Sequence, residues 1–350
     1  MNKLKVGILG ATGMVGQRFI QLLENHPWFE VTELAASERS AGKLYKEAVS
    51  GRWKISHEVP DYVQDLVVKE CRPNLDCSIV FSALDASVAG EIEEDFAKAG
   101  YVVASNARNH RMDKDVPLLI PEINPEHMEL IKIQKKNRKW DGCIVTNPNC
   151  STIHLNLALK PLYDSFGLEN VIVTTMQALS GAGYPGVASL DILDNVIPFI
   201  GGEEEKIQTE TLKIFGRLNN GEVRNADFSV STQCNRVNVK DGHLECVNVK
   251  LSKSADVEEV ISSMENFNPL KRLNLPTSPK RPIVVLKQDD RPQPKLDRDI
   301  ENGMASVVGR IRPCEILDYK FLVLGHNTIR GAAGASILNA ELMKAKGYLD

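Results

Sequence analysis

The opening of the chain constrains the fold more than any other stretch. Residues 3–9 predict a first β-strand, and residues 17–23 have the apolar spacing of a helix. Between them lies the glycine-rich segment GATGMVG, from Gly10 to Gly16. Glycines in such a turn let the backbone approach a pyrophosphate at the helix N-terminus, where unpaired N–H groups carry partial positive charge. A tight turn with close helix packing is the alternative. The predicted dinucleotide contacts are Gly10, Thr12, Gly13, Met14 and Val15.

The alternation of strands and helices continues through the first half of the chain. Strands are predicted at residues 31–36, 77–84 and 101–106, with a helix over residues 88–98. Strands that alternate with helices form a parallel sheet with right-handed crossovers. The carboxyl ends of these strands are expected to face the cofactor. The first half is therefore predicted to be an α/β, Rossmann-like domain.

The loop after the second strand bears on the choice of cofactor. An NAD enzyme usually has an acidic residue there for the ribose, and Glu38 is a candidate. Ser37, Arg39, Ser40 and Lys43 together fit a 2′-phosphate better. A charge-assisted contact between arginine and phosphate is worth about 1.5–3 kcal/mol. We therefore predict NADP, with a solvated polar loop as the alternative.

Length and charge exclude several classes of protein. A chain of 350 residues usually divides into two domains. Its net charge of −4 provides no general attraction to nucleic acid or membrane, and no apolar run reaches membrane-spanning length. The seven cysteines are scattered without zinc-ligand spacing, so no metal is predicted. This cysteine usage and the absence of a signal peptide favour the cytoplasm.

A candidate nucleophile lies near the middle of the sequence. The apolar run at residues 142–145 predicts a strand, and residues 152–159 predict a helix packed on a sheet. Asn147-Pro148 forces a turn between them, which places Cys150 near the first turn of the helix. Unpaired N–H groups at that position favour a thiolate. A small buried cysteine is the alternative for an isolated residue of this type.

The second half has a different pattern. A long strand is predicted at residues 171–179, followed by a glycine-rich loop and a helix from about residue 201 to 217. Residues 228–239 and 243–252 are predicted to form a hairpin around Asp241-Gly242. Pairing across that turn would put Arg236 and His243 on one sheet face. A cation beside a titratable ring would make a plausible site.

Several of these segments together resemble the aspartate-β-semialdehyde dehydrogenase family, in its archaeal and fungal branch. The resemblance covers nearly the whole chain. It rests on GATGMVG, on SERSAG from Ser37, on NPNCST from Asn147, on QALSGAG from Gln177, on GEEEK from Gly202, on NRV from Asn235 and on GH at His243. It implies NADPH-dependent reduction of L-4-aspartyl phosphate to L-aspartate 4-semialdehyde and phosphate, a step toward lysine, threonine and methionine.

The resemblance also implies roles for individual residues. Cys150 would be the nucleophile, His243 the acid and base, and Gln177 the residue that orients the acyl intermediate. The implied substrate ligands are Arg236 for the α-carboxylate, Glu203 for the ammonium, Arg111 and Lys206 for the phosphate, and Asn149. Further implied cofactor contacts are Ser82, Ser180, Gly181 and Asn327. Bacterial relatives commonly have a proline where this chain has Asn238, which weakens the local match but preserves the spacing between Arg236 and His243.

The family architecture implies two domains. Residues 1–149, completed by a C-terminal helix at 328–350, would bind the cofactor. Residues 150–327 would form an α+β catalytic and dimerisation domain with a mixed sheet, in a homodimer or homotetramer. Malonyl-CoA reductase and N-acetylglutamyl-phosphate reductase are the nearest alternative enzymes. A catalytically silent NADP-binding sensor is an alternative from another class.

Overall fold

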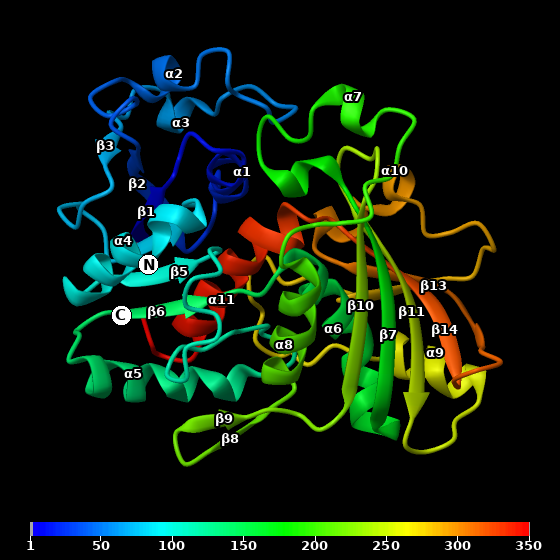
Figure 1. Cartoon of the computed structure of the whole chain (residues 1–350). Coiled ribbons are helices and arrows are strands. Elements are labelled where there is room, and N and C mark those ends of the chain that lie inside the picture. The colour runs from blue at the N-terminus through cyan, green and yellow to red at the C-terminus, as the bar shows by residue number, and fades with distance from the viewer. Residues whose placement is uncertain (1–2, 350) are drawn as a thin grey trace.

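Six parallel strands organise the first half of the chain, as the pattern of the sequence predicts. The computed structural model describes residues 3–349, and these strands pair in the order β3-β2-β1-β4-β5-β6 (Figure 1). The order reverses direction between β1 and β4, which is where dinucleotides bind in such folds. The strands are β1 (Leu4–Leu9), β2 (Phe29–Ala36), β3 (Lys69–Glu70), β4 (Ile79–Ser82), β5 (Val102–Ser105) and β6 (Cys143–Thr146). The helices are α1 (Met14–Leu23), α2 (Tyr45–Ala48), α3 (Asp61–Gln64), α4 (Ala86–Lys98), the 3₁₀-helix η1 (Pro125–Glu129) and α5 (Leu130–Arg138).

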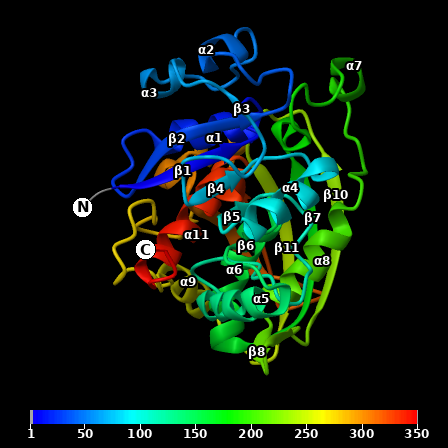
Figure 2. The ribbon, with the colours of Figure 1, turned by 90° about the vertical axis from the view of Figure 1, so that its left-hand side faces the viewer.

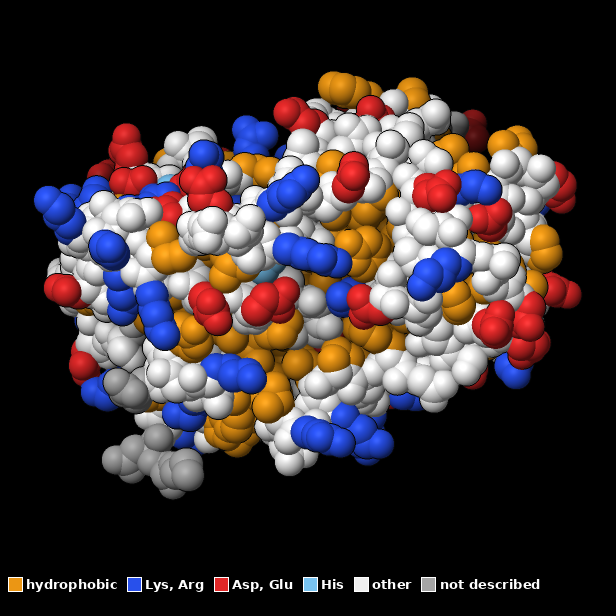
Figure 3. Space-filling model, turned by 90° about the horizontal axis from the view of Figure 1, so that it is seen from below, with side chains coloured by type: hydrophobic (Ala, Val, Ile, Leu, Met, Phe, Trp, Pro, Cys, Tyr) orange, Lys and Arg blue, Asp and Glu red, His pale blue; other side chains and the backbone are white. Residues whose placement is uncertain are grey.

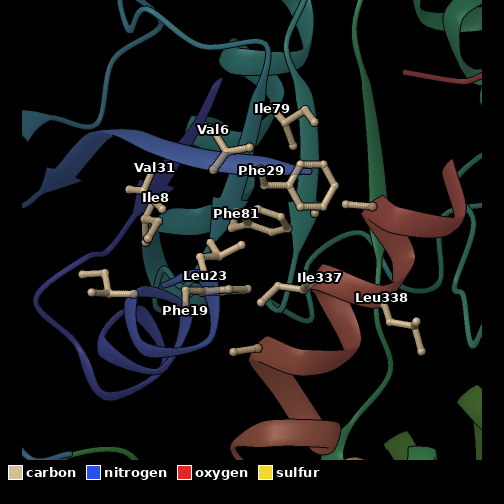
Figure 4. Packing of buried hydrophobic residues seen from close by; sticks show 14 of the residues in the cluster. Val6, Ile8, Phe19, Leu23, Phe29, Val31, Ile79, Phe81, Ile337 and Leu338 are labelled. Carbon is tan, nitrogen blue, oxygen red and sulfur yellow. The ribbon is translucent and has the colours of Figure 1, made fainter. Parts of the chain in front are cut away.

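The end of the chain completes the core of this first lobe. After the π-helix η4 (Ile329–Ala333), the final helix α11 (Gly334–Ala345) packs against the β1–β6 sheet, which the red ribbon shows in Figures 1 and 2. Ile337 of α11 points toward Phe19 of α1 and Phe81 of β4 (Figure 4). All three side chains are buried. Burial of α11 in this core stabilises an arrangement in which the last residues return to the first lobe.

The second lobe is built on a mixed sheet, as predicted. Its order is β10-β7-β11-β14-β13-β12, with β10/β7 and β12/β13 parallel and the other pairs antiparallel. The strands are β7 (Leu168–Gln177), β10 (Ser229–Arg236), β11 (His243–Leu251), β12 (Ile283–Leu286), β13 (Ser306–Pro313) and β14 (Tyr319–Gly325), beside a small hairpin of β8 (Arg217–Asn219) and β9 (Glu222–Arg224). The helical segments are α6 (Cys150–Phe166), η2 (Leu179–Ala182), α7 (Ser189–Ile192), α8 (Glu203–Ile214), α9 (Val257–Glu265), α10 (Pro294–Asp297) and η3 (Ile300–Gly303).

The predicted hairpin at Asp241-Gly242 is wrong. β10 and β11 do not pair with each other, because β7 lies between them, parallel to β10 and antiparallel to β11. The inference drawn from that hairpin survives for another reason. Arg236 pairs with Gln177, and Leu244 pairs with Met176, so the next position places His243 opposite Gln177. Arg236, Gln177 and His243 therefore form one row across three strands, with their side chains on one face.

The helices α6 and α9 cover that face of the second sheet. Every second residue of β11 from His243 to Leu251 is buried, while the residues between them are half-buried. On β7, Ile172 is exposed. The opposite face of this sheet is thus only partly covered within one chain.

The surface mixes both signs of charge. On the face seen in Figure 3, acidic and basic side chains are interspersed, and apolar side chains show between them. Within the described residues, we find no helix that combines the length and apolar character needed to cross a membrane.

Candidate active site

The first turn of α6 presents Cys150 between the two lobes. β6 ends at Thr146, and the helix begins at Cys150, as the Asn-Pro turn predicts. Asn149 is the N-cap, and its Oδ1 accepts hydrogen bonds from the Ser151 and Thr152 amides at 2.9 and 3.3 Å. A Cβ added at Gly331 of η4 would lie only 2.8 Å from the Cβ of Cys150. Only glycine therefore permits this close approach of η4 to the nucleophile turn.

His243 lies against the cysteine. Its Nε2 is 3.1 Å from the sulfur of Cys150. Its Nδ1 accepts a hydrogen bond from the Ala178 amide at 3.0 Å. Because Nδ1 is an acceptor, the hydrogen of the neutral ring is on Nε2 and faces the sulfur. The ring is therefore oriented to donate a proton toward Cys150.

Burial determines the resting charge of this pair. Burial, followed by the Glu203 carboxylate, raises the pKa of the Cys150 thiol to about 12. Arg111, Arg236 and the Ser151 amide lower that pKa, as the helix terminus predicts, but their effect is smaller. Burial, followed by the Arg236 charge, holds the pKa of His243 well below its ordinary value. At neutral pH the resting pair is therefore a thiol and a neutral imidazole.

Charged side chains from α8 and from the loop after β5 lie beside the cysteine. Glu203 accepts hydrogen bonds from Lys206 at 2.8 Å and from the Asn149 side chain at 2.5 Å. Burial opposes ionisation of Glu203, but Lys206, Asn149 and Gln177 outweigh it and lower the pKa of that carboxyl. Arg111 is buried, and its Nη1 lies 2.9 Å from Oε1 of Glu210. Arg111 and Lys206 are thus each paired with a carboxylate of α8.

A cavity of about 730 Å³ runs from the first glycine turn to these residues. Most of the predicted contacts line it: Gly10, Thr12, Gly13, Met14, Val15, Ser37, Arg111, Asn149, Cys150, Ser180, Gly181, Glu203, Lys206 and Asn327. Asn327 accepts a hydrogen bond from the Gly242 amide at 2.9 Å and donates one to Ser180 Oγ at 2.8 Å. This residue therefore connects the β11 entry to the glycine-rich loop after β7.

Three predicted cofactor residues do not line the cavity. Ser82 is fully buried, and its carbonyl accepts from the backbone and side-chain amides of Asn106. Ser40 is buried, while Arg39 is exposed at the surface nearby. Ser82 ends β4 with its side chain buried, so its predicted contact with the cofactor stays a prediction that the cavity lining does not support.

Three predicted catalytic or substrate residues lie just behind the cavity wall. Gln177, Arg236 and His243 are buried and do not line it. A Cβ added at Gly181 would lie 2.9 Å from Arg236 Nη1 and 3.1 Å from the His243 ring. A side chain at position 181 would therefore crowd Arg236 and His243, and glycine lets the loop pack closely over them. Arg236 also donates to the Ala178 carbonyl at 2.7 Å.

The glycine turn fits a dinucleotide. A Cβ at Gly10 would lie 2.6 Å from the Ala83 carbonyl oxygen, and a Cβ at Gly16 would lie 2.3 Å from the Gly10 carbonyl oxygen. These contacts hold the turn against β4 and bring the amides of the first turn of α1 to the cavity. No acidic residue occurs in that turn of α1. Among residues 3–349, no group of three or more His, Cys, Asp and Glu side chains is placed to hold a metal ion.

Comparison with known proteins agrees with this geometry. Residues 5–131 match the family model described as the semialdehyde dehydrogenase NAD-binding domain, and residues 159–330 match the semialdehyde dehydrogenase dimerisation domain. Aspartate-semialdehyde dehydrogenase of Archaeoglobus fulgidus is 58% identical over 342 residues, covering 97% of this chain and 98% of the relative. The enzyme of Schizosaccharomyces pombe is 51% identical, with 99% of each chain covered.

This chain belongs to the aspartate-semialdehyde dehydrogenase family. A crystal structure of the Candida albicans aspartate-semialdehyde dehydrogenase with NADP superposes with a TM-score of 0.91 at 46% identity, covering 99% of this chain and 100% of the other. The resemblance inferred from the sequence motifs, including its archaeal and fungal branch, is confirmed. The predicted fold class is confirmed as well.

Sequence reasoning missed several residues of this dehydrogenase site. Glu210 and Asn106 contact Arg111, and Gly331 contacts Cys150. The spacing of Glu203, Lys206 and Glu210 along one helix face could have drawn attention to Glu210. The contact of Gly331 has no local signal, because it joins residues far apart in the sequence.

Proposed function

We propose that this protein catalyses the NADPH-dependent reduction of L-4-aspartyl phosphate to L-aspartate 4-semialdehyde and phosphate. The observation that carries the proposal is the contact of 3.1 Å between His243 Nε2 and the Cys150 sulfur, beside a cavity that the glycine turn also lines. Family membership at 58% identity to an aspartate-semialdehyde dehydrogenase supports it. The product feeds the routes to lysine, threonine and methionine.

The residues of the chain account for the covalent step. The Cys150 sulfur attacks the acyl carbon and the bond from that carbon to the phosphate oxygen breaks. The thiol proton leaves with the phosphate as hydrogen phosphate, and a thioester forms on Cys150. NADPH, when bound, supplies the hydride that reduces this thioester. His243 Nε2–H faces the sulfur and is placed to donate a proton to the oxygen that becomes negative at the same carbon. Gln177, one strand away from His243, is proposed to orient the acyl group.

The charges of the pocket match the three charges of the substrate. We assign Arg236 to the α-carboxylate, Glu203 to the α-ammonium, and Arg111 with Lys206 to the phosphate. Contact with Arg236 requires the segment η2 to shift, because Gly181 now separates Arg236 from the cavity. Asn149, which bonds to Glu203, is proposed to hold that carboxylate in place.

The alternatives fit the pocket less well. Malonyl-CoA has no ammonium group, so Glu203, paired only with Lys206, would lie as a like charge beside the malonyl carboxylate. N-acetylglutamyl phosphate carries an amide in place of the ammonium, so it also offers no cation for Glu203 to bind. A silent sensor would not need Cys150 and His243 in contact. The relatives reported above are named for aspartate semialdehyde, in agreement with the main proposal.

Phosphate-dependent reduction of NADP by aspartate semialdehyde tests the function in the reverse direction. We expect turnover only when phosphate and the semialdehyde are both present. Cys150→Ala is expected to abolish turnover while NADPH binding changes little, because the glycine turn binds the cofactor. Efficient reduction of malonyl-CoA with no oxidation of the semialdehyde would contradict the assignment.

Substrate choice is tested at Glu203 and Lys206. Glu203→Ala is expected to lower kcat/KM for the semialdehyde, because the substrate ammonium loses its partner. Lys206→Ala is expected to raise the KM for phosphate more than that for the semialdehyde. Equal effects of both variants on every substrate would argue that the pair serves only the helix terminus, where acidic residues contribute about 0.3–1 kcal/mol each.

The assembly and compartment are also proposals. We propose a homodimer or homotetramer that covers the partly exposed face of the second sheet, supported by the match to a dimerisation domain. We propose that residues 1–149 with 328–350 form the cofactor domain and residues 150–327 the catalytic domain. We place the protein in the cytoplasm, because Cys150 acts only as a reduced thiol and all seven cysteines are free.

A further inference from the structure

One face of α8 carries a row of buried or half-buried charged residues directed at the site. Glu203, Lys206, Glu210 and Lys213 follow one another at intervals of three or four positions, which places them on one side of the helix. Glu203, Glu210 and Lys213 are at most 5% exposed. Glu203 and Lys206 line the cavity, whereas Glu210 and Lys213 do not. Glu210 and Lys213 therefore interact with groups of the protein and not with a ligand in that cavity.

Glu210 bonds to two separate parts of the site. Its Oε1 accepts a hydrogen bond from Arg111 Nη1 at 2.9 Å, and its Oε2 accepts one from the backbone amide of Asn149 at 2.6 Å. Arg111 belongs to the loop after β5, and Asn149 caps the helix that begins with Cys150. One carboxylate from the second lobe thus fixes both the cation and the nucleophile turn.

Lys213 holds the backbone around Arg111. Its Nζ donates to the carbonyl oxygens of Arg111, Asp113 and Val116 at 2.7, 2.8 and 3.0 Å. Because α8 binds Arg111 at both its backbone and its guanidinium, the position of that cation is set by this helix. Arg111 Nη2 is also occupied by the Asn106 carbonyl at 2.7 Å, while its Nε has no partner among the described residues. The guanidinium is therefore held by Glu210 and Asn106, and Nε is the N–H donor that has no partner among the described residues.

We propose that Glu210 is a positioning residue for the step in which phosphate leaves the acyl phosphate. It holds Arg111 and the Asn149 amide so that the guanidinium and Cys150 can contact the same acyl phosphate. This inference rests on the proposed function, which assigns Arg111 to the phosphate. Glu210 does not touch the substrate, because it lies behind Arg111 and outside the cavity. It also offsets part of the Arg111 charge, since the two groups form a buried ion pair.

Two substitutions separate the contacts. Glu210→Gln keeps the shape of the side chain, loses the charge and can accept from only one of the two partners through its oxygen. Glu210→Ala loses both contacts. Steady-state oxidation of the semialdehyde is measured while phosphate, semialdehyde and NADP are varied in turn. We expect the KM for phosphate to rise in the order wild type, Glu210→Gln, Glu210→Ala, by about 10-fold or more for the last.

The KM for NADP separates positioning from general damage. We expect it to change by less than about twofold in both variants, because the glycine turn lies elsewhere. Glu205→Gln is the matched control, since Glu205 is an exposed carboxylate on the same helix, and all its kinetic constants should equal those of the wild type. Should Glu210→Ala fail to fold, the near-isosteric Glu210→Gln carries the test. Equal increases in all three KM values, or an unchanged KM for phosphate in Glu210→Gln, would overturn the proposal.

A double-mutant cycle connects Glu210 to Arg111. Arg111→Ala should raise the KM for phosphate, and adding Glu210→Ala to it should change that KM by less than about twofold. If Arg111→Ala has no effect on phosphate while the wild type remains phosphate-dependent, the assignment of Arg111 and the role of Glu210 both fail, and the proposed reaction stands. If the wild type shows no phosphate-dependent oxidation, the proposed function itself fails and the inference with it.

Discussion

At the scale of single residues, burial decides the chemistry of the site more than proximity to a helix terminus does. The Ser151 amide acts on the Cys150 thiol in the expected direction, but loss of water and the Glu203 charge outweigh it. The ring of His243 is neutral for the same reason. A sulfur that stays protonated at rest is protected from oxidation and alkylation until the substrate arrives.

Alkylation of the free protein tests this resting state. Since the pKa of Cys150 is raised to about 12, its thiolate fraction rises with pH throughout the neutral range. We expect the rate of iodoacetamide labelling at Cys150 to increase about tenfold per pH unit between roughly pH 7 and pH 10, without a plateau.

Cys314 provides an internal control for the labelling. The Leu317 amide, followed by the Ile316 amide, lowers the pKa of the Cys314 thiol, so this half-buried residue should react first at pH 7. Mass spectrometry of peptides follows both sites in one sample. A plateau for Cys150 below about pH 8 would show that the resting protein contains a thiolate.

At the same scale, we propose that Arg39 decides the choice of cofactor. Arg39 is exposed and forms no ion pair within the described part of the chain, so its guanidinium is available for a 2′-phosphate. We expect Arg39→Ala to lower kcat/KM for NADP by about 10- to 150-fold and to change that for NAD little. Arg272→Ala, which removes an exposed arginine outside the cavity, is the control. Equal losses of kcat/KM with NADP and NAD would show that Arg39 does not contact the 2′-phosphate.

At the scale of elements, the π-helix η4 is the part that brings the end of the chain to the nucleophile. Its Gly331 touches Cys150, while α11 continues into the core of the first lobe. π-Turns of this kind frequently occur at functional sites, because they redirect a helix without ending it. The position of Cys150 thus depends on a segment 181 residues away from it in the sequence, from 150 to 331.

Gly331→Ala tests that contact. The added methyl group would lie 2.8 Å from the Cβ of Cys150, so either η4 or the first turn of α6 must shift. We expect kcat to fall by about 10- to 100-fold, because small displacements of a nucleophile are costly. Gly201→Ala is the control, since a Cβ there meets nothing within 4 Å and its φ is not positive. An unchanged kcat in Gly331→Ala would show that η4 can shift to accommodate the methyl group without displacing Cys150.

At the scale of the whole molecule, the two lobes share one chain that crosses between them more than once. α8 of the second lobe fixes the loop that carries Arg111, and α11 completes the core of the first lobe. The site is therefore assembled from both lobes and requires both to be folded. Loss of packing at either crossing should destabilise the protein and impair the site together.

Ile337→Ala measures the contribution of α11 to the first lobe. Ile337 is fully buried beside Phe19 and Phe81 (Figure 4). Removing its side chain should lower the free energy of unfolding by about 2–5 kcal/mol, because the cavity is only partly filled by relaxation. Ile316, which is 88% exposed, is the matched control, and Ile316→Ala should change stability by about 0.5 kcal/mol or less. Urea unfolding of the two variants gives the comparison, and equal losses would contradict the packing role of α11.

Local patterns in the sequence determined most strands of the first lobe, with helices α1 and α4, the glycine turn and the start of α6 at Cys150, but not β3, α2 or α3. These features depend on apolar periodicity, glycine and proline, which act over a few residues. The family motifs added the expected roles of Cys150, His243 and the substrate ligands, and the comparisons confirm the family itself. Where the prediction relied on a turn signal to pair strands, at Asp241-Gly242, it was wrong.

Only the tertiary structure decided how distant segments meet. β7 lies between β10 and β11 because strand order follows the packing of whole faces, and a two-residue turn signal cannot encode it. The hydrogen bonds of Glu210 to Arg111 and Asn149 join residues 99 and 61 positions apart, so no periodic pattern in the sequence predicts them. The raised pKa of Cys150 depends on water excluded by both lobes, which exists only once they have folded together.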